Sequence, residues 1–483
     1  MRIEDDEFLH KTERADAFLA SYEPAERFLT EAGSASDRIL VVSHLDADGL
    51  TSAAIMLEVL RRCGIEYDLR VVHTIDETEA EAIALSTANR TIFVDIGSGQ
   101  LATIAEHLKG PTLILDHHES DIETPHRYVH INPLLHGQDG NSGISGAGTV
   151  YLLARRLGYR DLSHLAIVGA IGDIQEHNGF SGFNELIISD ALESGMMTVE
   201  RGVRLFGAQT RPLTKLLAYN HDLQLEGITG DPNAAYRFLD SLGIRINHSR
   251  GERRYIDLEP DERMRLLSGI LIRRSHLPEP EAIIGYTYTL VHEEEGTPFR
   301  DAREFSTLLN ACGRMDKASI GVGAAMGIPD LKREALAVEK TYKRAIGRAI
   351  GWFKEQLLLE ERIERGEGYY LIDGRGEIGA PIIGTLASIA SRMDEVEGPA
   401  LICSYAYLEN GDLKASLRSH GDTGHDLHEV MTRIVENVGG GAGGHTNAAG
   451  ALIPREREDA FIASTRDTLA SLTSSRSPSP NAG

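Results

Sequence analysis

Short apolar runs alternate with amphipathic stretches from residue 38 onward. The runs RILVVSH, YDLRVVH, TIFVDIG and TLILDHH are continuous enough to be buried on both faces, and segments with helical spacing, such as LTSAAIMLEVLRRC, separate them. This β-α-β-α order predicts a parallel sheet with helices on both sides. We therefore expect an α/β domain over residues 38–195.

The rest of the chain predicts further regions with different patterns. Their expected bounds are a helical N-terminal extension at 1–37, a helical insertion that completes the first domain at 196–330, a connecting helix at 331–366, a smaller C-terminal α/β domain at 367–456, and a C-terminal helix with a disordered Ser/Pro-rich tail at 457–483. Asn410-Gly411 between apolar runs predicts a hairpin in the C-terminal domain.

Composition limits the possible chemistry. At 483 residues the chain is too long for one core, and its formal net charge of −24 argues against a general coat for DNA, because affinity for phosphates comes from Lys and Arg. The acidity is also compatible with a salty cytoplasm.

No long apolar run is present, so we expect a soluble cytoplasmic protein with no membrane partner. Three scattered cysteines without a CxxC pair leave His and carboxylate as metal ligands.

Ligand-type side chains follow three of the predicted strands. They are His44, Asp46 and Asp48 after the first strand, Asp95 after the third, and Asp116, His117 and His118 after the fourth. The carboxyl ends of parallel strands share one edge of a sheet, where ligands bind, so we expect these side chains to meet.

Asp173 adds another carboxylate after the mostly apolar stretch LAIVGAIG. A buried carboxylate is costly without a cation or a donor, so Asp173 is a further candidate ligand. A set of four aspartates with one or two histidines suits Mn²⁺, with Mg²⁺ as the alternative, and needs roughly two ions to offset its charge. Two such ions in one site are typical of phosphoester hydrolysis.

Each motif alone has an ordinary structural explanation. HLDADG could be a calcium-like loop, LDHH could be an Asp that caps the next turn beside two surface histidines, and Asp95 could be a turn residue. Their shared position at successive strand ends favours one functional site.

A glycine run, GGGAGGHTNAAG, lies between a predicted helix and an apolar strand near the C-terminus. Such runs are often linkers, but exposed backbone N–H groups and His445 favour phosphate or nucleotide binding here. Arg418, in a strand-like stretch, would place a guanidinium near this run, with a solvated arginine as the alternative. The candidate binding residues are Ser416, Arg418, Gly440, Gly441, Gly443, Gly444 and His445.

These motifs together resemble the DHH phosphoesterase superfamily. HLDADG, VDIG, LDHH and GDIQEH resemble its four motifs in order, and GGGAGGHTNAAG, interrupted by Ala442, resembles the signature of its DHH-associated C-terminal domain. REFSTLLNACGRMDKASIGVGAAMG, with GITGD and DLEPDERMRLL, resembles the archaeal RecJ-like exonucleases, relatives of the DHH-derived subunit of the eukaryotic replicative helicase.

The resemblance implies Mn²⁺- or Mg²⁺-dependent, stepwise hydrolysis of single-stranded DNA or RNA in replication or repair. It also implies the GINS replication complex as a partner, because some relatives associate with it. Other relatives have lost catalysis, but every metal-ligand position is present here.

The same resemblance implies roles for individual residues. His44, Asp46 and Asp95 would bind one metal, and Asp48, Asp95, His117 and Asp173 the other, with Asp95 bridging. His118 would contact the scissile phosphate, and Asp116 would orient a neighbouring histidine. Arg418 and the loop from Gly440 to His445 would hold the end of the strand across a cleft between domains, and Arg303 and Arg314 would lie along its path.

Three functions therefore stay open at this point. The leading hypothesis is a single-strand-specific exonuclease that releases mononucleotides. The second is a phosphodiesterase for very short oligonucleotides or cyclic dinucleotides, although such proteins usually lack a long insertion. The third is a scaffold role in the replisome with secondary catalysis.

Overall fold

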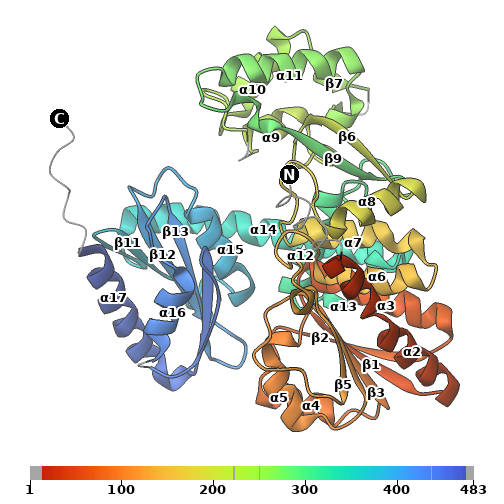
Figure 1. Cartoon of the computed structure of the whole chain (residues 1–483). Helices are drawn as coiled ribbons and strands as arrows, with labels where there is room; N and C mark the ends of the chain where they lie inside the picture. Colours follow the sequence, from red (N-terminus) through yellow and green to blue (C-terminus); the bar gives the residue numbers. More distant parts are fainter. Residues whose placement is uncertain (1–12, 221–222, 250, 437, 475–483) are drawn as a thin grey trace, which may run out of the picture. The chain divides into compact units, whose positions relative to one another are not determined.

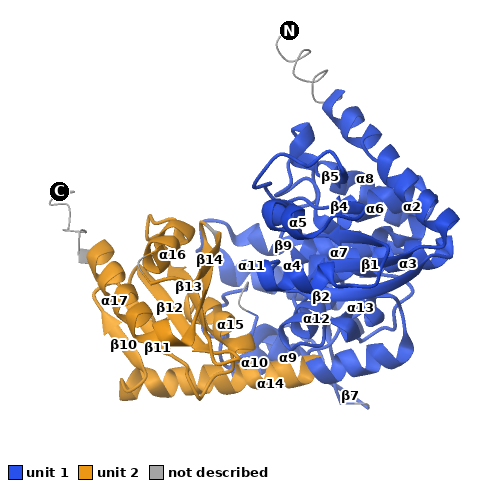
Figure 2. Ribbon diagram, turned by 90° about the horizontal axis from the view of Figure 1, so that it is seen from below, with its two compact units in different colours: residues 1–338 blue, residues 339–483 orange. Residues whose placement is uncertain are grey.

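A computed structural model describes residues 13–220, 223–249, 251–436 and 438–474 of the chain. The chain divides into two compact units, residues 1–338 and residues 339–483 (Figure 2). The tail predicted beyond residue 474 lies outside the described residues.

Unit 1 contains the predicted parallel sheet (Figure 1). Its strands are β1 (Arg38–His44), β2 (Glu66–Val72), β3 (Arg90–Val94), β4 (Thr112–Leu115) and β5 (Tyr128–Ile131), in the spatial order β2-β1-β3-β4-β5. All neighbouring pairs are parallel. The α/β fold class is thus confirmed for this part of the chain.

Successive residues of each central strand enter opposite cores. In β1, Ile39 and Val41 pack into one cluster, while Leu40 and Val42 pack into the other. Each such side chain stabilises the fold by roughly 1.5–3 kcal/mol, so a slip of one residue would exchange the two faces and is strongly disfavoured. This register fixes where the strand ends lie.

Helices cover both faces of this sheet (Figure 1). The helices of the larger core are α2 (Glu23–Ala35), α3 (Ala47–Cys63), α6 (Gly146–Arg156), α7 (Ser163–Gly172), α8 (Phe183–Glu193), α12 (Ala302–Arg314) and α13 (Ala318–Ala325). The helices of the smaller core are α4 (Glu77–Ala84) and α5 (Leu101–His107).

The insertion in unit 1 has a hydrophobic core of its own. Its helices are α9 (Leu213–Ala218), α10 (Pro232–Ser241) and α11 (Pro260–Arg274). An antiparallel pair, β6 (Met197–Val203) and β9 (Ile284–Leu290), flanks these helices, and the short strands β7 (Asn247–His248) and β8 (Gly251–Glu252) pair between them. The sequence pattern predicted only the helices, because strands that pair across a long insertion need tertiary contacts to be specified.

Unit 2 is built on a mixed six-stranded sheet with the order β10-β11-β12-β13-β15-β14. Its strands are β10 (Ile363–Gly366), β11 (Tyr369–Asp373), β12 (Ala400–Tyr407), β13 (Leu413–His420), β14 (Gly441–His445) and β15 (Ala448–Ile453). Its further helices are α15 (Ala380–Ala390), α16 (Leu427–Glu436) and α17 (Glu458–Ser474), and α14 (Pro329–Leu359) joins the two units in sequence. The predicted hairpin is confirmed between β12 and β13, where Gly411 takes the left-handed backbone that the turn requires.

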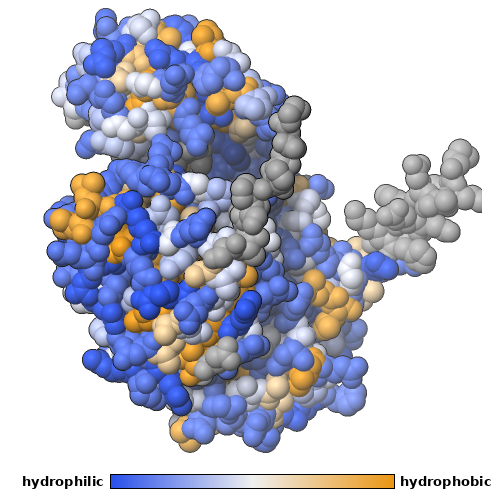
Figure 3. Space-filling model, turned by 90° about the vertical axis from the view of Figure 1, so that its left-hand side faces the viewer, coloured by the Kyte–Doolittle hydropathy of each residue, from blue (hydrophilic) through white to orange (hydrophobic). Residues whose placement is uncertain are grey.

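Hydrophobic residues form separate patches among hydrophilic ones on the face drawn in Figure 3. Within the described ranges, every helix is too short or too polar to cross a membrane.

Candidate metal centre

The turn from β1 into α3 positions the first ligand-type residues. Asp46 caps the N-terminus of α3, where its Oδ1 accepts a hydrogen bond from the Gly49 N–H at 3.0 Å. A Cβ on Gly49 would lie 2.2 Å from the His44 carbonyl oxygen, so only glycine lets the chain turn this tightly. His44 and Asp46 are thereby held at the edge of the sheet.

Asp95 follows β3 in a strained conformation. Its backbone is left-handed, with φ of 57°, and its N–H donates to the Leu115 carbonyl at 2.9 Å. Left-handed Asp is uncommon but tolerated, and such strain is concentrated at functional sites. The side chain is 2% exposed, and neither carboxylate oxygen has a hydrogen-bond partner.

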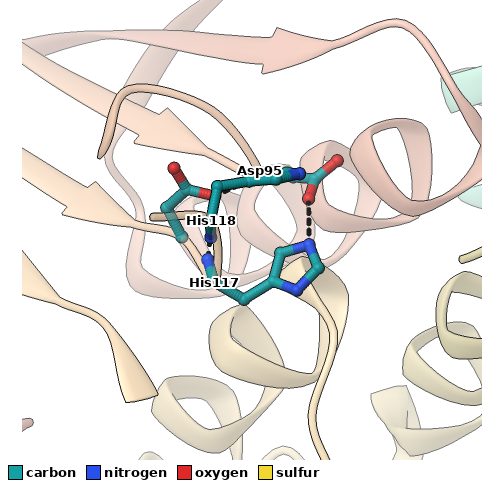
Figure 4. Close-up of side chains that lie close together, drawn as sticks. Asp95, His117 and His118 are labelled. Atoms are coloured by element: carbon teal, nitrogen blue, oxygen red, sulfur yellow. Dashed lines mark hydrogen bonds and ion pairs between the residues drawn. The ribbon is translucent and has the colours of Figure 1, made fainter. Parts of the chain in front are cut away.

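The two oxygens of Asp95 face two different clusters, and Figure 4 shows the carboxylate directed at the ring of His117. Oδ2 lies 3.7 Å from His44 Nδ1, which lies 3.1 Å from Asp46 Oδ2. Oδ1 lies 3.3 Å from His117 Nε2. The same His117 nitrogen lies 3.8 Å from Asp48 and 3.9 Å from Asp173. Tertiary structure thus brings all six predicted metal ligands together. His44, Asp46 and Asp95 form one group and Asp48, His117 and Asp173 another, and Asp95 Oδ1 faces the second.

His117 is oriented by a single backbone contact. Its Nδ1–H donates to the Gly140 carbonyl at 2.6 Å, which leaves Nε2 facing the carboxylates. That buried Nε2 has no hydrogen-bond partner. An imidazole held in this way, beside two orphaned carboxylate oxygens, has the donor set that a divalent cation needs.

Asp48 is held by the N-terminus of α6. It accepts hydrogen bonds from Ser145 Oγ at 2.8 Å and from the backbone N–H groups of Gly146 and Ala147 at 2.7 and 3.0 Å. A Cβ on Gly146 would lie 2.2 Å from Asp95 Oδ1, so this helix can approach both acids only through glycine. Sequence reasoning missed Ser145 and Gly146, although Ser-Gly-Ala-Gly at a helix start is a signal for a close N-terminal approach.

Asp116 and His118 form a hydrogen-bonded pair next to Asp95 and His117, and these four residues are a further group that could hold a cation. Asp116 is fully buried and accepts from His118 Nδ1 and the His117 N–H at 2.8 Å each and from the Ser98 N–H at 2.9 Å. The side chain of His118 is 42% exposed. The structure therefore places Asp116 where it can orient His118, as the resemblance implies.

Asp173 comes from a helix end and not from a strand. It ends α7, and Gln175 Nε2 donates to its Oδ2 at 2.8 Å and to the Gly140 carbonyl at 3.0 Å. His177 does not share a helix face with Asp173, because α7 ends at Gly172 and Ile174 turns left-handed.

Electrostatics indicate a site in which several buried carboxylates are crowded together. Burial, together with the charges of Asp95 and Asp173, raises the pKa of Asp48 well above its usual value. Burial likewise raises the pKa of Asp173 to about 6. Burial alone would lower the pKa of His44 and of His117, but the neighbouring carboxylates outweigh it and raise both. Divalent cations would offset this crowding of carboxylates.

Metal affinity should therefore depend on pH. The carboxylates around His44 and His117 raise the pKa of both imidazoles, so a metal ion must compete with protons for their nitrogens. We expect the dissociation constant for Mn²⁺ to fall by about tenfold per pH unit for each proton released. Titration calorimetry at pH 6, 7 and 8, in buffers of different ionisation enthalpy, measures the dissociation constant for Mn²⁺ and the number of protons released on binding. An affinity that does not change over this range would contradict the expectation.

A cavity of about 170 Å³ opens beside His44 and Asp95. Four of the predicted site residues line it, and its other lining residues are His73, Thr74, Ile96, Gly97, Gly99 and Gln100. The sequence analysis did not assign these six to the site, although His73 follows β2 directly and Ile96 and Gly97 follow Asp95 in the VDIG motif.

In unit 2, the glycine run forms β14 at the edge of the sheet, so the linker alternative is excluded. A Cβ on Gly440 or Gly444 would lie 2.6 or 2.3 Å from the carbonyl oxygens of Leu452 and Ala448, so both must be glycine. Gly441 and Gly443 pair with β15, and His445 ends β14.

Arg418 lies on β13, which β15 separates from the glycine strand β14 in the sheet. Its Nε donates to Ser388 Oγ at 2.8 Å, and its Nη1 donates to the carbonyls of Leu417 and Ala449 at 2.8 and 3.3 Å. Ser416 is buried on the same strand, opposite Gly450.

The two arginines predicted along the strand's path come from opposite ends of α12. Arg303 forms an ion pair with Glu176 and donates to the Tyr286 carbonyl at 3.1 Å. Arg314 ends the helix and is exposed. The six metal candidates thus converge in unit 1, whereas the roles of Arg303 and Arg314 stay predictions.

Three family models match the chain. They are the DHH family N-terminal domain over residues 38–172, the DHH-CID domain over 205–281 and the DHHA1 domain over 382–471. The single-stranded-DNA-specific exonuclease RecJ of Thermus thermophilus is 28% identical over 178 residues. The chain is a RecJ-like member of the DHH superfamily.

Similarity to individual proteins of this superfamily differs in extent. The uncharacterized protein MJ0831 of Methanocaldococcus jannaschii is 29% identical over 438 residues, which cover 88% of this chain and 91% of that protein. The match to T. thermophilus RecJ covers 35% of this chain and only 27% of that protein.

Solved structures of the DHH superfamily share the fold of this RecJ-like chain. A crystal structure of exonuclease RecJ bound to manganese matches with a TM-score of 0.56 at 16% identity and covers 96% of this chain and 95% of that one. CDC45 from Entamoeba histolytica matches with a TM-score of 0.63 at 12% identity over 93% of this chain and 99% of that one. At such identities the likeness shows the fold alone.

Proposed function

We propose that this RecJ-like protein is a two-metal-ion phosphodiesterase that removes mononucleotides from an end of single-stranded DNA or RNA in replication or repair. The observation that carries the proposal is Asp95, whose two unpartnered oxygens face two separate groups of ligand-type side chains. A single bridging carboxylate between two cation sites is suited to hydrolysis of a phosphodiester.

Each metal site would take its ligands from the groups described above. His44, Asp46 and Asp95 would hold one divalent cation, and Asp48, Asp95, His117 and Asp173 the other. Mn²⁺ is the expected ion because imidazole is present in both groups, and Mg²⁺ is the alternative. Such cations, when bound, supply an activated water and stabilise negative charge on the phosphate. A RecJ structure with bound manganese supports this choice of metal.

The protein's own groups would position the substrate. Asp116 accepts from His118 Nδ1 and raises the pKa of His118 against the lowering effect of burial, so a cationic imidazole can donate its Nε2–H to the scissile phosphate. In unit 2, Ser416, Arg418 and the segment from Gly440 to His445 would bind the sugar-phosphate backbone. Arg303 and Arg314 would contact the strand farther along, although Arg303 must then share its guanidinium with Glu176.

Replacement of His118 by Ala should separate catalysis from metal binding. We expect kcat to fall by about 100-fold, because one charge-assisted hydrogen bond to the phosphate is lost, while the affinity for Mn²⁺ changes little. Steady-state kinetics and metal titration measure the two effects. A parallel loss of metal affinity would assign His118 to the metal site instead.

The direct test is a time course on long single strands labelled at the 5′ or the 3′ end, as DNA and as RNA, with Mn²⁺ or Mg²⁺. Mononucleotides that appear from the first time points support the proposal and identify the polarity. Cleavage confined to dinucleotides would contradict it. A matched duplex serves as the control for single-strand specificity.

A second candidate is a binding role in a replication complex, with GINS as the expected partner and hydrolysis secondary. The fold shared with CDC45 over 93% of this chain is compatible with it. Stable co-purification with GINS, together with full biological function of a metal-free variant, would favour this role over the first.

A further inference from the structure

The helix that carries Asp173 ends in a turn that normally requires glycine. After α7, the Gln175 N–H donates to the Ala170 carbonyl at 2.9 Å, and the Ile174 N–H donates to the Ile171 carbonyl at 3.2 Å. This pair of bonds defines a Schellman motif, in which the residue before the last donor takes a left-handed backbone. Here that residue is Ile174, with φ of 58°.

Isoleucine is an unfavourable choice at this position. A branched Cβ in the left-handed region is close to the following carbonyl oxygen, and glycine or asparagine avoids that strain. The other non-glycine residues with positive φ in the described parts of the chain are all polar, namely Ser36, Asp95, Asn178, Gln224, Asp316 and Glu360. The backbone therefore gives no reason for an aliphatic residue at position 174.

Burial does not explain why isoleucine occupies position 174 either. Ile174 is 74% exposed, whereas Gln175 beside it is 2% exposed. An exposed aliphatic side chain alone is ordinary, as at Leu85, which is 83% exposed but has a helical φ of −80°. Ile174 combines exposure with strain, so its side chain costs stability without contributing to the core.

Ile174 lies in a turn that adjoins the metal centre in sequence. Ile174 directly follows Asp173, whose Oδ2 lies 3.9 Å from His117 Nε2. Gln175 ties the turn to the Ile144 carbonyl at 3.2 Å, and Glu176 Oε1 accepts from the Gly179 N–H at 3.1 Å. These bonds fix the turn on the C-terminal side of Ile174, so the strained, exposed residue is held directly next to a candidate metal ligand.

We propose that Ile174 contacts the base of the nucleotide next to the scissile phosphate. The inference rests on the proposed function and adds a subsite to it. The ligand groups carry several carboxylates that repel a polyanion, and the cations act on phosphate, so the uncharged base needs a separate, non-electrostatic contact. A fixed aliphatic side chain supports the face of any base without reading its sequence, as stacking platforms do.

The test compares an ordinary strand with an abasic strand of the same length and charge. Binding is measured with Mn²⁺ by fluorescence anisotropy, and cleavage is followed in parallel. For the wild type we expect about tenfold tighter binding and a lower KM for the strand that has bases. In Ile174→Gly this preference should disappear, while the unfolding temperature and its rise with Mn²⁺ are no lower than in the wild type.

Two further variants complete the experiment. Ile174→Val keeps a branched aliphatic side chain and should retain the preference for bases. Leu85→Gly should leave the dissociation constants for the ordinary strand and for the abasic strand unchanged. If Ile174→Gly keeps the preference, the proposed subsite is wrong, whatever the cleavage result. If strands bind with the preference but are not cut, the subsite stands and the proposed hydrolysis fails. If the wild type neither binds nor cuts, both fail.

Discussion

Replacing Asp95 by Asn should abolish activity, with a loss of about 10⁴-fold in kcat/KM. Asn has nearly the same shape and tolerates the left-handed backbone of this position, so the fold should be kept. The variant loses the charge that both ligand groups share, and one of its two side-chain oxygens is replaced by an NH₂ group that cannot bind a cation.

The stability of the metal-free variant is expected to change much less than its activity. Asp95 lies 2% exposed among other carboxylates, and its charge contributes to raising the pKa of both Asp48 and Asp173. Removing this charge relieves repulsion from Asp48 and Asp173 but also removes attraction to His44 and His117, so metal-free Asp95→Asn should unfold at a temperature close to that of the wild type. Added Mn²⁺ should then fail to raise the unfolding temperature.

Calorimetric unfolding with and without Mn²⁺, together with nuclease kinetics, measures these effects. The matched control is Asp68→Asn on β2, whose half-exposed carboxylate lies 3.5 Å from Arg38 and far along the strand from its carboxyl end. It should leave activity and metal response unchanged. A nuclease rate near that of the wild type for Asp95→Asn would refute the bridging assignment.

Replacing Gly146 by Ala should lower activity by about 10³-fold, although Gly146 carries no chemical group. The added Cβ would lie 2.2 Å from Asp95 Oδ1 and 2.6 Å from Asp95 Cβ, both far below contact distance. Either Asp95 or the start of α6 must move. Movement of α6 would also break the bonds from Gly146 and Ala147 to Asp48, so both ligand groups lose their geometry.

Such crowding should reduce the free energy of unfolding by about 1–3 kcal/mol, which is the usual cost of an overpacked site. The control is Gly347→Ala in α14, where an added Cβ meets no atom within 4 Å, and here alanine should stabilise the helix by roughly 0.5–1 kcal/mol. Denaturant unfolding and Mn²⁺ titration distinguish the two outcomes. Full metal affinity in Gly146→Ala would show that the site tolerates a displaced carboxylate.

A strongly acidic protein that binds nucleic acid must concentrate its attraction locally. The net charge of −24 repels a polyanion at long range, so affinity has to come from bound cations, from arginines such as Arg418 and from contacts to uncharged bases. This is the physical reason that the metal centre and Ile174 are expected to act together.

Much of the metal centre was predictable from the sequence. Apolar strands followed by Asp or His indicate a parallel sheet, and parallel strands bring their carboxyl ends to one edge whatever the details of packing. The pattern along the chain is therefore enough to place His44, Asp95 and His117 together. The hairpin at Asn410-Gly411 was equally predictable, because its turn depends only on local backbone preferences.

Other features depend on contacts between distant segments, and only the tertiary structure decided them. The antiparallel pairing of β6 with β9 joins segments separated by the whole insertion, and the pattern along either strand does not specify its partner. The approach of Gly146 to Asp95, the ion pair of Arg303 with Glu176 and the left-handed turn at Ile174 likewise result from how helices pack. Sequence alone determined which side chains are available as ligands, because that follows from local pattern. Tertiary structure decided how the two oxygens of Asp95 are divided between the two groups, because packing orients a side chain.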